Sequence, residues 1–336
     1  MPNITVVPLS ALEANQEADV FALLAEKETK KTKTGKPYLL VLFKDSKREI
    51  RFPIWSDLPI YEEFNLLQPG MFCKLRAIYR INQYGVNQYN QHLEIHRIRQ
   101  AVDDDKKDGF DPLMLRPKSP FPLDAMFEEL QTIAEKQLGK TKIRLLVMKV
   151  LKDNRAAVLT CTAARWHHHC YIGGLLEHTL SVTKIALALV NHYHTLYPNR
   201  KKDISRELTI AGAILHDIGK IREYEPEVGS MKHSVEGELL GHAILGRDIV
   251  RDAAKEIELE THLREQLEHI IIAHQCYPDW GAAKPPMSLE AMLVHHADSC
   301  DALTGCFWNI FEQDNSSEPL TSKKNVIGYQ LLKPAH

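Results

Sequence analysis

The sequence predicts a two-domain chain, in which an all-β N-terminal domain precedes an all-helical C-terminal domain. Short apolar stretches separated by turn residues fill residues 18–98, and a charged, proline-rich segment follows them. From Leu123 onward, apolar residues recur with the 3.6-residue period of helices. The chain has 336 residues, which suffices for two domains of ordinary size.

The N-terminal domain, residues 14–100, contains five predicted strands with one helical insertion. The turns Thr34-Gly35-Lys36 and Tyr84-Gly85 separate strands, and a short helix is expected over Leu58–Leu66. The predicted strands are Ala18–Glu26, Pro37–Lys44, Glu49–Trp55, Met71–Arg80 and a stretch ending in His92–Ile98. This arrangement favours a small closed barrel such as an OB-fold.

Residues 101–122 are predicted to be a linker, because they combine the charged run Asp103–Asp108 with four prolines. The all-α domain is expected over residues 123–312, and residues 313–336 are expected to form a polar tail. The predicted helices cover residues 123–138, 140–152, 153–163, 173–197, 203–217, 234–256, 259–275 and 288–312.

Composition excludes several classes of protein. The formal net charge of −2 is not that of a polycation that coats nucleic acid. The six cysteines include no CxxC pair, the N-terminus lacks the pattern of a signal peptide, and no apolar stretch is long enough to span a membrane. These features predict a cytoplasmic protein with free thiols and no membrane partner.

Histidine is concentrated in the second half of the chain, where 14 of the 17 histidines lie between residues 167 and 296. Helical spacing places His178, His274 and Asp298 on the apolar faces of three predicted helices. One buried histidine with a hydrogen-bond partner would be unremarkable. Several helices that direct ionisable groups inward point instead to a shared site.

Two further segments fit the same site. His216-Asp217 ends a helix after the small residues Ala211-Gly212-Ala213, and His242 lies among the glycines of Gly237–Gly246. Ionisable groups on apolar faces cost several kcal/mol unless they are paired or bind a metal. The sequence therefore favours a metal centre. Imidazole and carboxylate ligands without thiolate suit Mn²⁺, Fe²⁺, Co²⁺ or Zn²⁺ better than Mg²⁺ alone.

The local sequence Leu215-His216-Asp217-Ile218-Gly219-Lys220 resembles the HD superfamily of metal-dependent phosphohydrolases. Two more segments, Gly173-Gly174-Leu175-Leu176-Glu177-His178 and His295-His296-Ala297-Asp298-Ser299-Cys300-Asp301, narrow this resemblance. They are similar to bacterial 3′-to-5′ exoribonucleases of the YhaM type, which join an N-terminal OB-fold to an HD domain. The resemblance covers most of the chain and is strongest over about residues 165–302.

The resemblance implies two divalent metal ions, with Mn²⁺ preferred, and a reaction in which a metal-activated water releases nucleoside monophosphates from a 3′ end. Single-stranded RNA is the favoured substrate, and single-stranded DNA would suit the same chemistry. Metal one would be held by His178, His216, Asp217 and Asp298, and metal two by Asp217, His242 and His274. Relatives tend to carry a second histidine directly after the one at 274, whereas this chain has Gln275. The coordination of the second metal is therefore left open.

Further residues are assigned to the substrate. Lys220, one helical turn beyond the catalytic Asp217, is assigned to oxyanion stabilisation, although a lysine that caps a helix end would look the same. Arg165 suits bidentate binding of a phosphate, and His168 and His169 belong to a histidine run of which one member is expected to touch phosphate.

The barrel carries a local basic segment. Residues 27–51 hold nine Lys or Arg against three acids, a local net charge of +6, with aromatic residues interleaved. Lys36, Tyr38 and Arg51 are candidates for contact with a single strand, because cations follow its backbone and aromatic rings stack on its bases. The alternative is a solvated charge run at a hairpin tip.

Three other functions stay open at this point. HD sites also hydrolyse nucleotides or cyclic nucleotides, but no Gly-Tyr-Pro signature follows the HD core. A relaxase-like HD module of a mobile element would show a similar Gly-Gly-Leu-Leu region. A non-catalytic single-strand binder is the third. Self-association into a homo-oligomer is also left open.

Overall fold

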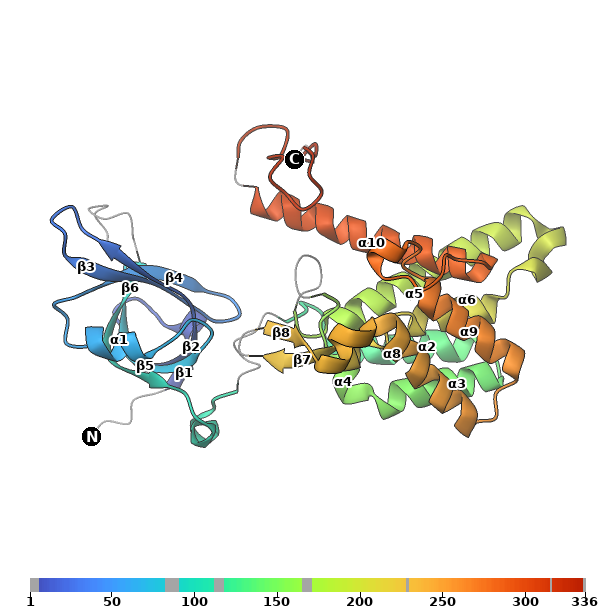
Figure 1. The fold of residues 1–336 in the computed structure, drawn as a ribbon, viewed down its shortest axis with the longest axis horizontal. Coiled ribbons are helices and arrows are strands. Elements are labelled where there is room, and N and C mark those ends of the chain that lie inside the picture. The colour runs from blue at the N-terminus through green and yellow to red at the C-terminus, as the bar shows by residue number, and fades with distance from the viewer. Residues whose placement is uncertain are drawn as a thin grey trace. The chain divides into compact units, whose positions relative to one another are not determined.

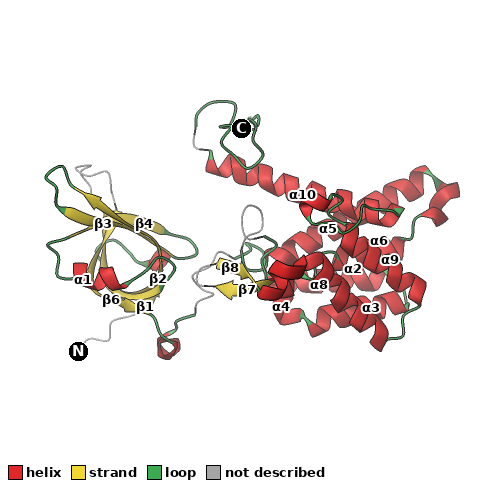
Figure 2. Ribbon diagram, viewed as in Figure 1, coloured by secondary structure: helices red, strands yellow, loops and turns green. Residues whose placement is uncertain are grey.

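The computed structural model confirms the predicted order of a mostly β part followed by a helical part. Its chain divides into two compact units, which we call the sheet unit (Met1–Lys118 with Pro226–Met231) and the helical unit (Ser119–Glu225 with Lys232–His336). Strands dominate the first unit and helices the second (Figures 1 and 2). The structure describes residues 6–81, 91–111, 118–164, 171–227, 230–314 and 316–334.

The sheet unit is built around β2 (Glu17–Lys31), which pairs antiparallel with β3 (Pro37–Lys44) and β5 (Phe72–Ile81). Within the described residues the sheet has the order β4-β3-β2-β5-β6, and β1 adds a parallel pairing to β2. The remaining elements are β1 (Val6–Pro8), β4 (Glu49–Trp55), β6 (Gln91–Gln100) and the helix α1 (Tyr61–Leu66) between β4 and β5. The predicted turn at Tyr84-Gly85 lies outside the described residues.

Two strands form where their apolar residues place them, β4 by alternation and β3 by an unbroken run of buried residues. β3 and β4 have the predicted bounds, and their inward side chains, such as Val41 and Phe52, are buried in one core. β2 extends beyond its predicted end at Glu26, because its backbone continues to pair with β3 as far as Lys31. Its polar end could not be recognised from hydrophobic alternation.

The first part of the predicted linker is ordered and packs on the sheet. Asp103–Asp108 forms a 3₁₀ helix, and the buried carboxylate of Asp105 accepts hydrogen bonds from both terminal nitrogens of Arg99 (2.7 Å each). Phe110 is also buried, with its ring 4.9 Å from that of Phe21. The acidic run of the predicted linker is therefore held by specific hydrogen bonds.

The helical unit contains the eight predicted helices, each with bounds close to those expected. They are α2 (Leu123–Gln137), α3 (Lys142–Asp153), α4 (Arg155–Thr160), α5 (Gly174–Leu196), α6 (Arg206–Leu215), α8 (Val235–Glu256), α9 (Thr261–Ala273) and α10 (Leu289–Gln313). Side-chain oxygens of Thr141, Ser205, Ser234 and Ser288 cap four of them by accepting a backbone N–H in the first turn. No described helix has the length and apolar character needed to cross a membrane.

The short elements between α6 and α8 were not predicted. The helix α7 (Lys220–Glu223) follows α6, and the strands β7 (Tyr224–Glu227) and β8 (Ser230–His233) form a small two-stranded sheet. The tail after α10 is polar, as expected, but it is folded back on itself. Lys333 pairs with Asp314 at 2.7 Å, and Leu320 bridges to Leu332.

Candidate metal centre

The six predicted ligands converge inside the helical unit from five different helices or helix ends. Their side chains come from α5, from the segment directly after α6, from α8, from the end of α9 and from α10. The ligands are His178, His216, Asp217, His242, His274 and Asp298. His178, His216, Asp217 and His274 are at most 1% exposed. The inward orientation deduced from helical spacing is thus confirmed for His178 and His274.

The first set of ligands surrounds one point. His178 Nε2 lies 3.1 Å from Asp298 Oδ1 and 3.4 Å from Asp217 Oδ2. His216 Nε2 lies 3.4 Å from the same Asp217 oxygen and 3.3 Å from His178 Nε2. Ligand atoms about 2.1 Å from one cation are about 3.0–3.4 Å apart. The spacing of the His178, His216 and Asp217 atoms therefore fits a single divalent ion, and Asp298 Oδ1 lies 3.9 Å from His216 Nε2 at its edge.

The second set shares Asp217 with the first. Its other oxygen, Oδ1, lies 3.5 Å from His242 Nε2 and 3.5 Å from His274 Nε2. This oxygen is buried and has no hydrogen-bond partner among the described residues. A buried carboxylate oxygen without a partner is costly, and a cation held by these three side chains would satisfy it. Asp217 thus presents one oxygen to each of two potential metal sites.

Each of the four histidines directs its Nε2 atom to the centre, because its Nδ1 atom donates a hydrogen bond elsewhere. His178 donates to Asp301 (2.7 Å), and His242 donates to Glu223 (3.0 Å). The Nδ1 atoms of His216 and His274 donate to the main-chain oxygens of Ala213 (2.8 Å) and Ile271 (2.6 Å). These bonds select the tautomer in which Nε2 carries a lone pair, which is the form that binds a metal.

Glycines allow His242 to reach the centre. Gly241, directly before it, has φ +70° and interrupts the regular helix of α8. A Cβ atom on Gly219 would lie 1.9 Å from the main-chain oxygen of His242 and 2.4 Å from the nitrogen of Gly246. Only glycine at 219 therefore permits α7 to approach α8 this closely. The approach places Glu223, at the end of α7, against His242.

The electrostatics of the centre favour a bound positive charge. Burial lowers the pKa of His178, but three neighbouring carboxylates outweigh it and hold this pKa well above the ordinary value. Burial also opposes ionisation of Asp217 and Asp298, yet nearby cationic groups keep the pKa of each carboxyl well below its usual range. For Asp217 the largest such contribution comes from Lys220. The donor set and its charges therefore fit divalent cations.

The other predicted site residues have different surroundings. Lys220 Nζ lies 2.6 Å from Asp217 Oδ2, at the edge of the first set. Gln275 lies beside the second set, with its amide nitrogen 3.0 Å from His242 Nε2. Arg165, His168 and His169 lie outside the described residues.

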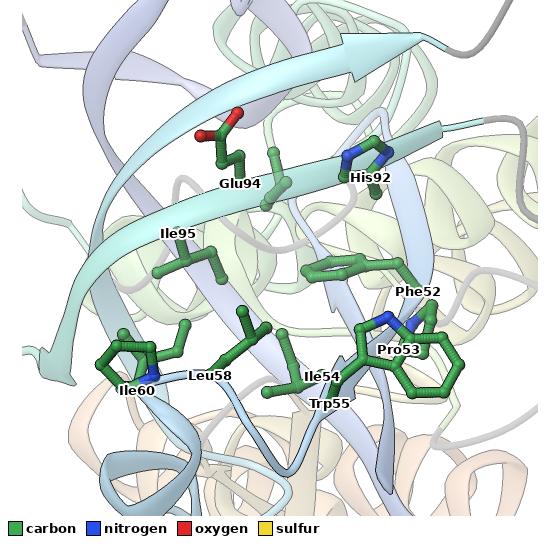
Figure 3. Close-up of a pocket in the computed structure, with 11 residues that line it drawn as sticks. Phe52, Pro53, Ile54, Trp55, Leu58, Ile60, His92, Glu94 and Ile95 are labelled. Atoms are coloured by element: carbon green, nitrogen blue, oxygen red, sulfur yellow. The ribbon is translucent and has the colours of Figure 1, made fainter. Parts of the chain in front are cut away.

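The candidate strand-binding residues lie in the sheet unit. Lys36 is exposed in the turn between β2 and β3, and the Tyr38 ring packs 5.0 Å from that of Trp55. Arg51 is paired with Glu26 at 2.6 Å, so its charge is partly neutralised. A cavity of about 320 Å³ lies beside Trp55 (Figure 3). Its lining residues come mainly from β4 and β6 and are Phe52, Pro53, Ile54, Trp55, Leu58, Pro59, Ile60, His92, Leu93, Glu94 and Ile95.

Sequence reasoning missed two acids that hold metal-facing histidines. Asp301 follows Asp298 by three residues on α10, so helical spacing alone could have placed both on one face. Glu223 gave no comparable signal, because it belongs to a four-residue helix and meets His242 only through the fold. Both carboxylates are within hydrogen-bond distance of an Nδ1 atom.

Comparisons with known proteins identify the family of the chain. Residues 175–303 match the HD domain family, and residues 125–224 match the TraI_2 family, described as "Putative helicase". The chain is 32% identical over 287 residues to a 3′-5′ exoribonuclease YhaM of Oceanobacillus iheyensis, covering 85% of this chain and 84% of that protein. YhaM proteins of Bacillus velezensis and Bacillus licheniformis are 30% and 29% identical, each over 86% of both chains. The chain therefore belongs to the YhaM family of HD-domain proteins.

Proposed function

We propose that this chain is a metal-dependent 3′-5′ exoribonuclease whose helical unit hydrolyses the terminal phosphodiester of an RNA strand. The observation that carries the proposal is the position of Asp217, whose two oxygens face two separate sets of buried ligands. Paired cations that share a carboxylate are a recurring device for hydrolysis of phosphate esters. The named activity of the YhaM relatives selects this reaction among those that an HD site could perform.

We assign the first cation to His178, His216, Asp217 and Asp298, and the second to Asp217, His242 and His274. When bound, the two cations would activate water and neutralise the negative charge of the phosphodiester. Imidazole and carboxylate donors suit Mn²⁺, Fe²⁺, Co²⁺ or Zn²⁺, and Mn²⁺ is our first choice because of the family resemblance. Lys220, whose ammonium lies 2.6 Å from Asp217, would stabilise negative charge that develops on the phosphate.

For the sheet unit we propose an OB-fold over residues 14–100 that holds the single strand, with the HD domain over residues 123–312. The succession of β2, β3, β4, the helix α1, β5 and β6 is the order of elements in an OB-fold. OB-folds bind strands at the face of their second and third strands, which here are β3 and β4. Tyr38 and Trp55 lie on those two strands, and Lys36 lies in the preceding turn.

The test uses an RNA oligonucleotide labelled at either its 5′ or its 3′ end, with Mn²⁺ present. We expect nucleoside monophosphates to be released first from the 3′ end, and Asp217→Asn to abolish this activity. Asp252→Asn is the matched control, because Asp252 is an exposed residue of α8 that pairs only with a neighbouring lysine in the described contacts. Retention of full activity in Asp217→Asn would remove the proposed centre, and degradation from the 5′ end would remove the proposed polarity.

The same oligonucleotide made as single-stranded DNA forms a second arm of the test. The match of residues 125–224 to TraI_2 makes this comparison informative. Faster trimming of DNA than of RNA would overturn the substrate class while leaving the metal centre in place.

A further inference from the structure

The Nε2 atom of His242 already has a hydrogen-bond partner. His242 donates its Nδ1 proton to Glu223, so the neutral imidazole has a single lone pair at Nε2. The side-chain amide of Gln275 donates to that lone pair at 3.0 Å. The same lone pair points to Asp217 Oδ1, 3.5 Å away, where the second cation would bind.

The Gln275 amide lies close to Gly281. Its oxygen, Oε1, is buried and has no hydrogen-bond partner among the described residues. A Cβ atom on Gly281 would lie 2.5 Å from this oxygen, so a larger residue at 281 would overlap the amide. An amide flip within the same space would place its oxygen, which cannot donate, against the lone pair of His242.

The first ligand set also has a neighbouring polar side chain, but this contact differs in kind. Lys220 also lies close to a ligand atom, Asp217 Oδ2, at 2.6 Å. A carboxylate oxygen has two lone pairs and can accept from an ammonium while it binds a metal, whereas an imidazole nitrogen has only one. The Gln275 contact excludes the cation, and the Lys220 contact does not.

We propose that Gln275 competes with the second cation for the lone pair of His242 and makes the second site the weaker of the two. The centre then loads in two steps. The first cation binds the set around His178 and His216, and the second binds only when the Gln275 amide is displaced from His242. This inference rests on the proposed two-cation centre and adds an order of occupancy to it.

The test is a calorimetric titration of the full-length protein with Mn²⁺ at constant pH. Wild type is expected to bind two ions with clearly different dissociation constants. Gln275→Ala is expected to lower the dissociation constant of the second step about 2- to 10-fold, the equivalent of one net hydrogen bond. The dissociation constant of the first step should stay within twofold of wild type. Gln275→Leu, which keeps most of the volume but cannot donate, should behave in the same way. Gln68→Ala, an exposed glutamine of the sheet unit, is the control and should change neither step.

A second dissociation constant that is unchanged or weaker in both Gln275 variants would overturn the inference, because the amide would then be neutral or a ligand. The unchanged first step reports that each variant is folded. Absence of any Mn²⁺ binding by wild type would instead overturn the proposed metal centre itself, so the two failures are distinguishable.

Discussion

The carboxylate of Glu223 gives the sharpest test of how the fold supports the second ligand set. Its Oε1 atom accepts both the Nδ1 proton of His242 (3.0 Å) and the main-chain N–H of the same residue (2.9 Å). Burial raises the pKa of Glu223, but contact with His242 outweighs it and keeps this pKa below the ordinary value. An ionised carboxylate thus orients the imidazole and increases the basicity of its Nε2 atom.

Replacement of this residue should weaken the second metal site in a graded manner. Removal of a carboxylate that holds a metal-binding histidine lowers metal affinity by about 10- to 100-fold, or about 1.4–2.8 kcal/mol. Glu223→Gln keeps an acceptor oxygen but loses the charge, so we expect a loss near the lower value. Glu223→Ala also leaves two donors of His242 without their partner, and we expect a loss near the higher value.

The measurement is the two-step Mn²⁺ titration, accompanied by the rate of RNA trimming at saturating Mn²⁺. Asp301→Asn is the matched comparison, because Asp301 holds His178 of the first set at 2.7 Å. We expect it to weaken the first step about tenfold. If Glu223→Ala leaves the second step unchanged while the protein remains folded, the carboxylate does not position His242 and the reasoning is wrong.

Three further predictions concern other parts of the molecule. Lys220→Met should lower kcat about 100-fold while the metal content stays that of wild type; an unchanged kcat would show that the lysine only pairs with Asp217. Gly219→Ala should lower the free energy of unfolding by about 1–3 kcal/mol, measured by urea unfolding, because its Cβ would overlap the His242 oxygen at 1.9 Å. Asp105→Asn should lower the free energy of unfolding by about 1.5–3 kcal/mol at pH 7, because Arg99 and other donors bind the carboxylate and hold its pKa well below the ordinary 3.8. That contribution is present above pH 3.8 and is lost from wild type as the pH falls further, so the difference in urea midpoint should shrink there.

The fold could be predicted where an element is long enough to show its period. β4 alternates along its length, β3 is marked by an unbroken run of buried apolar residues, and both have the predicted bounds. α7 and the strands β7 and β8 each have only four residues, which is too short for either period to appear. α7 depends on the close approach that Gly219 permits, and a contact of this kind between distant segments leaves no local pattern.

The candidate site could be predicted as far as helical faces reveal it. Spacing placed His178 and His274 toward the interior, where both are buried. The family resemblance identified Gln275 as a departure from related sequences, but it could not show that the amide reaches His242, because that contact depends on side-chain conformation.

Helix geometry explains why two of the four histidines need an acid and two do not. His216 and His274 lie directly after the last residues of α6 and α9, where main-chain oxygens are free of helical hydrogen bonds. Each donates its Nδ1 proton to the oxygen three residues earlier, so the helix end itself orients the ring. His178 lies inside α5, where those oxygens are already used within the helix. His242 directly follows the break at Gly241, and its main-chain N–H bonds Glu223 instead of a helical oxygen. Side chains accept the Nδ1 protons of both rings, Asp301 in the first ligand set and Glu223 in the second.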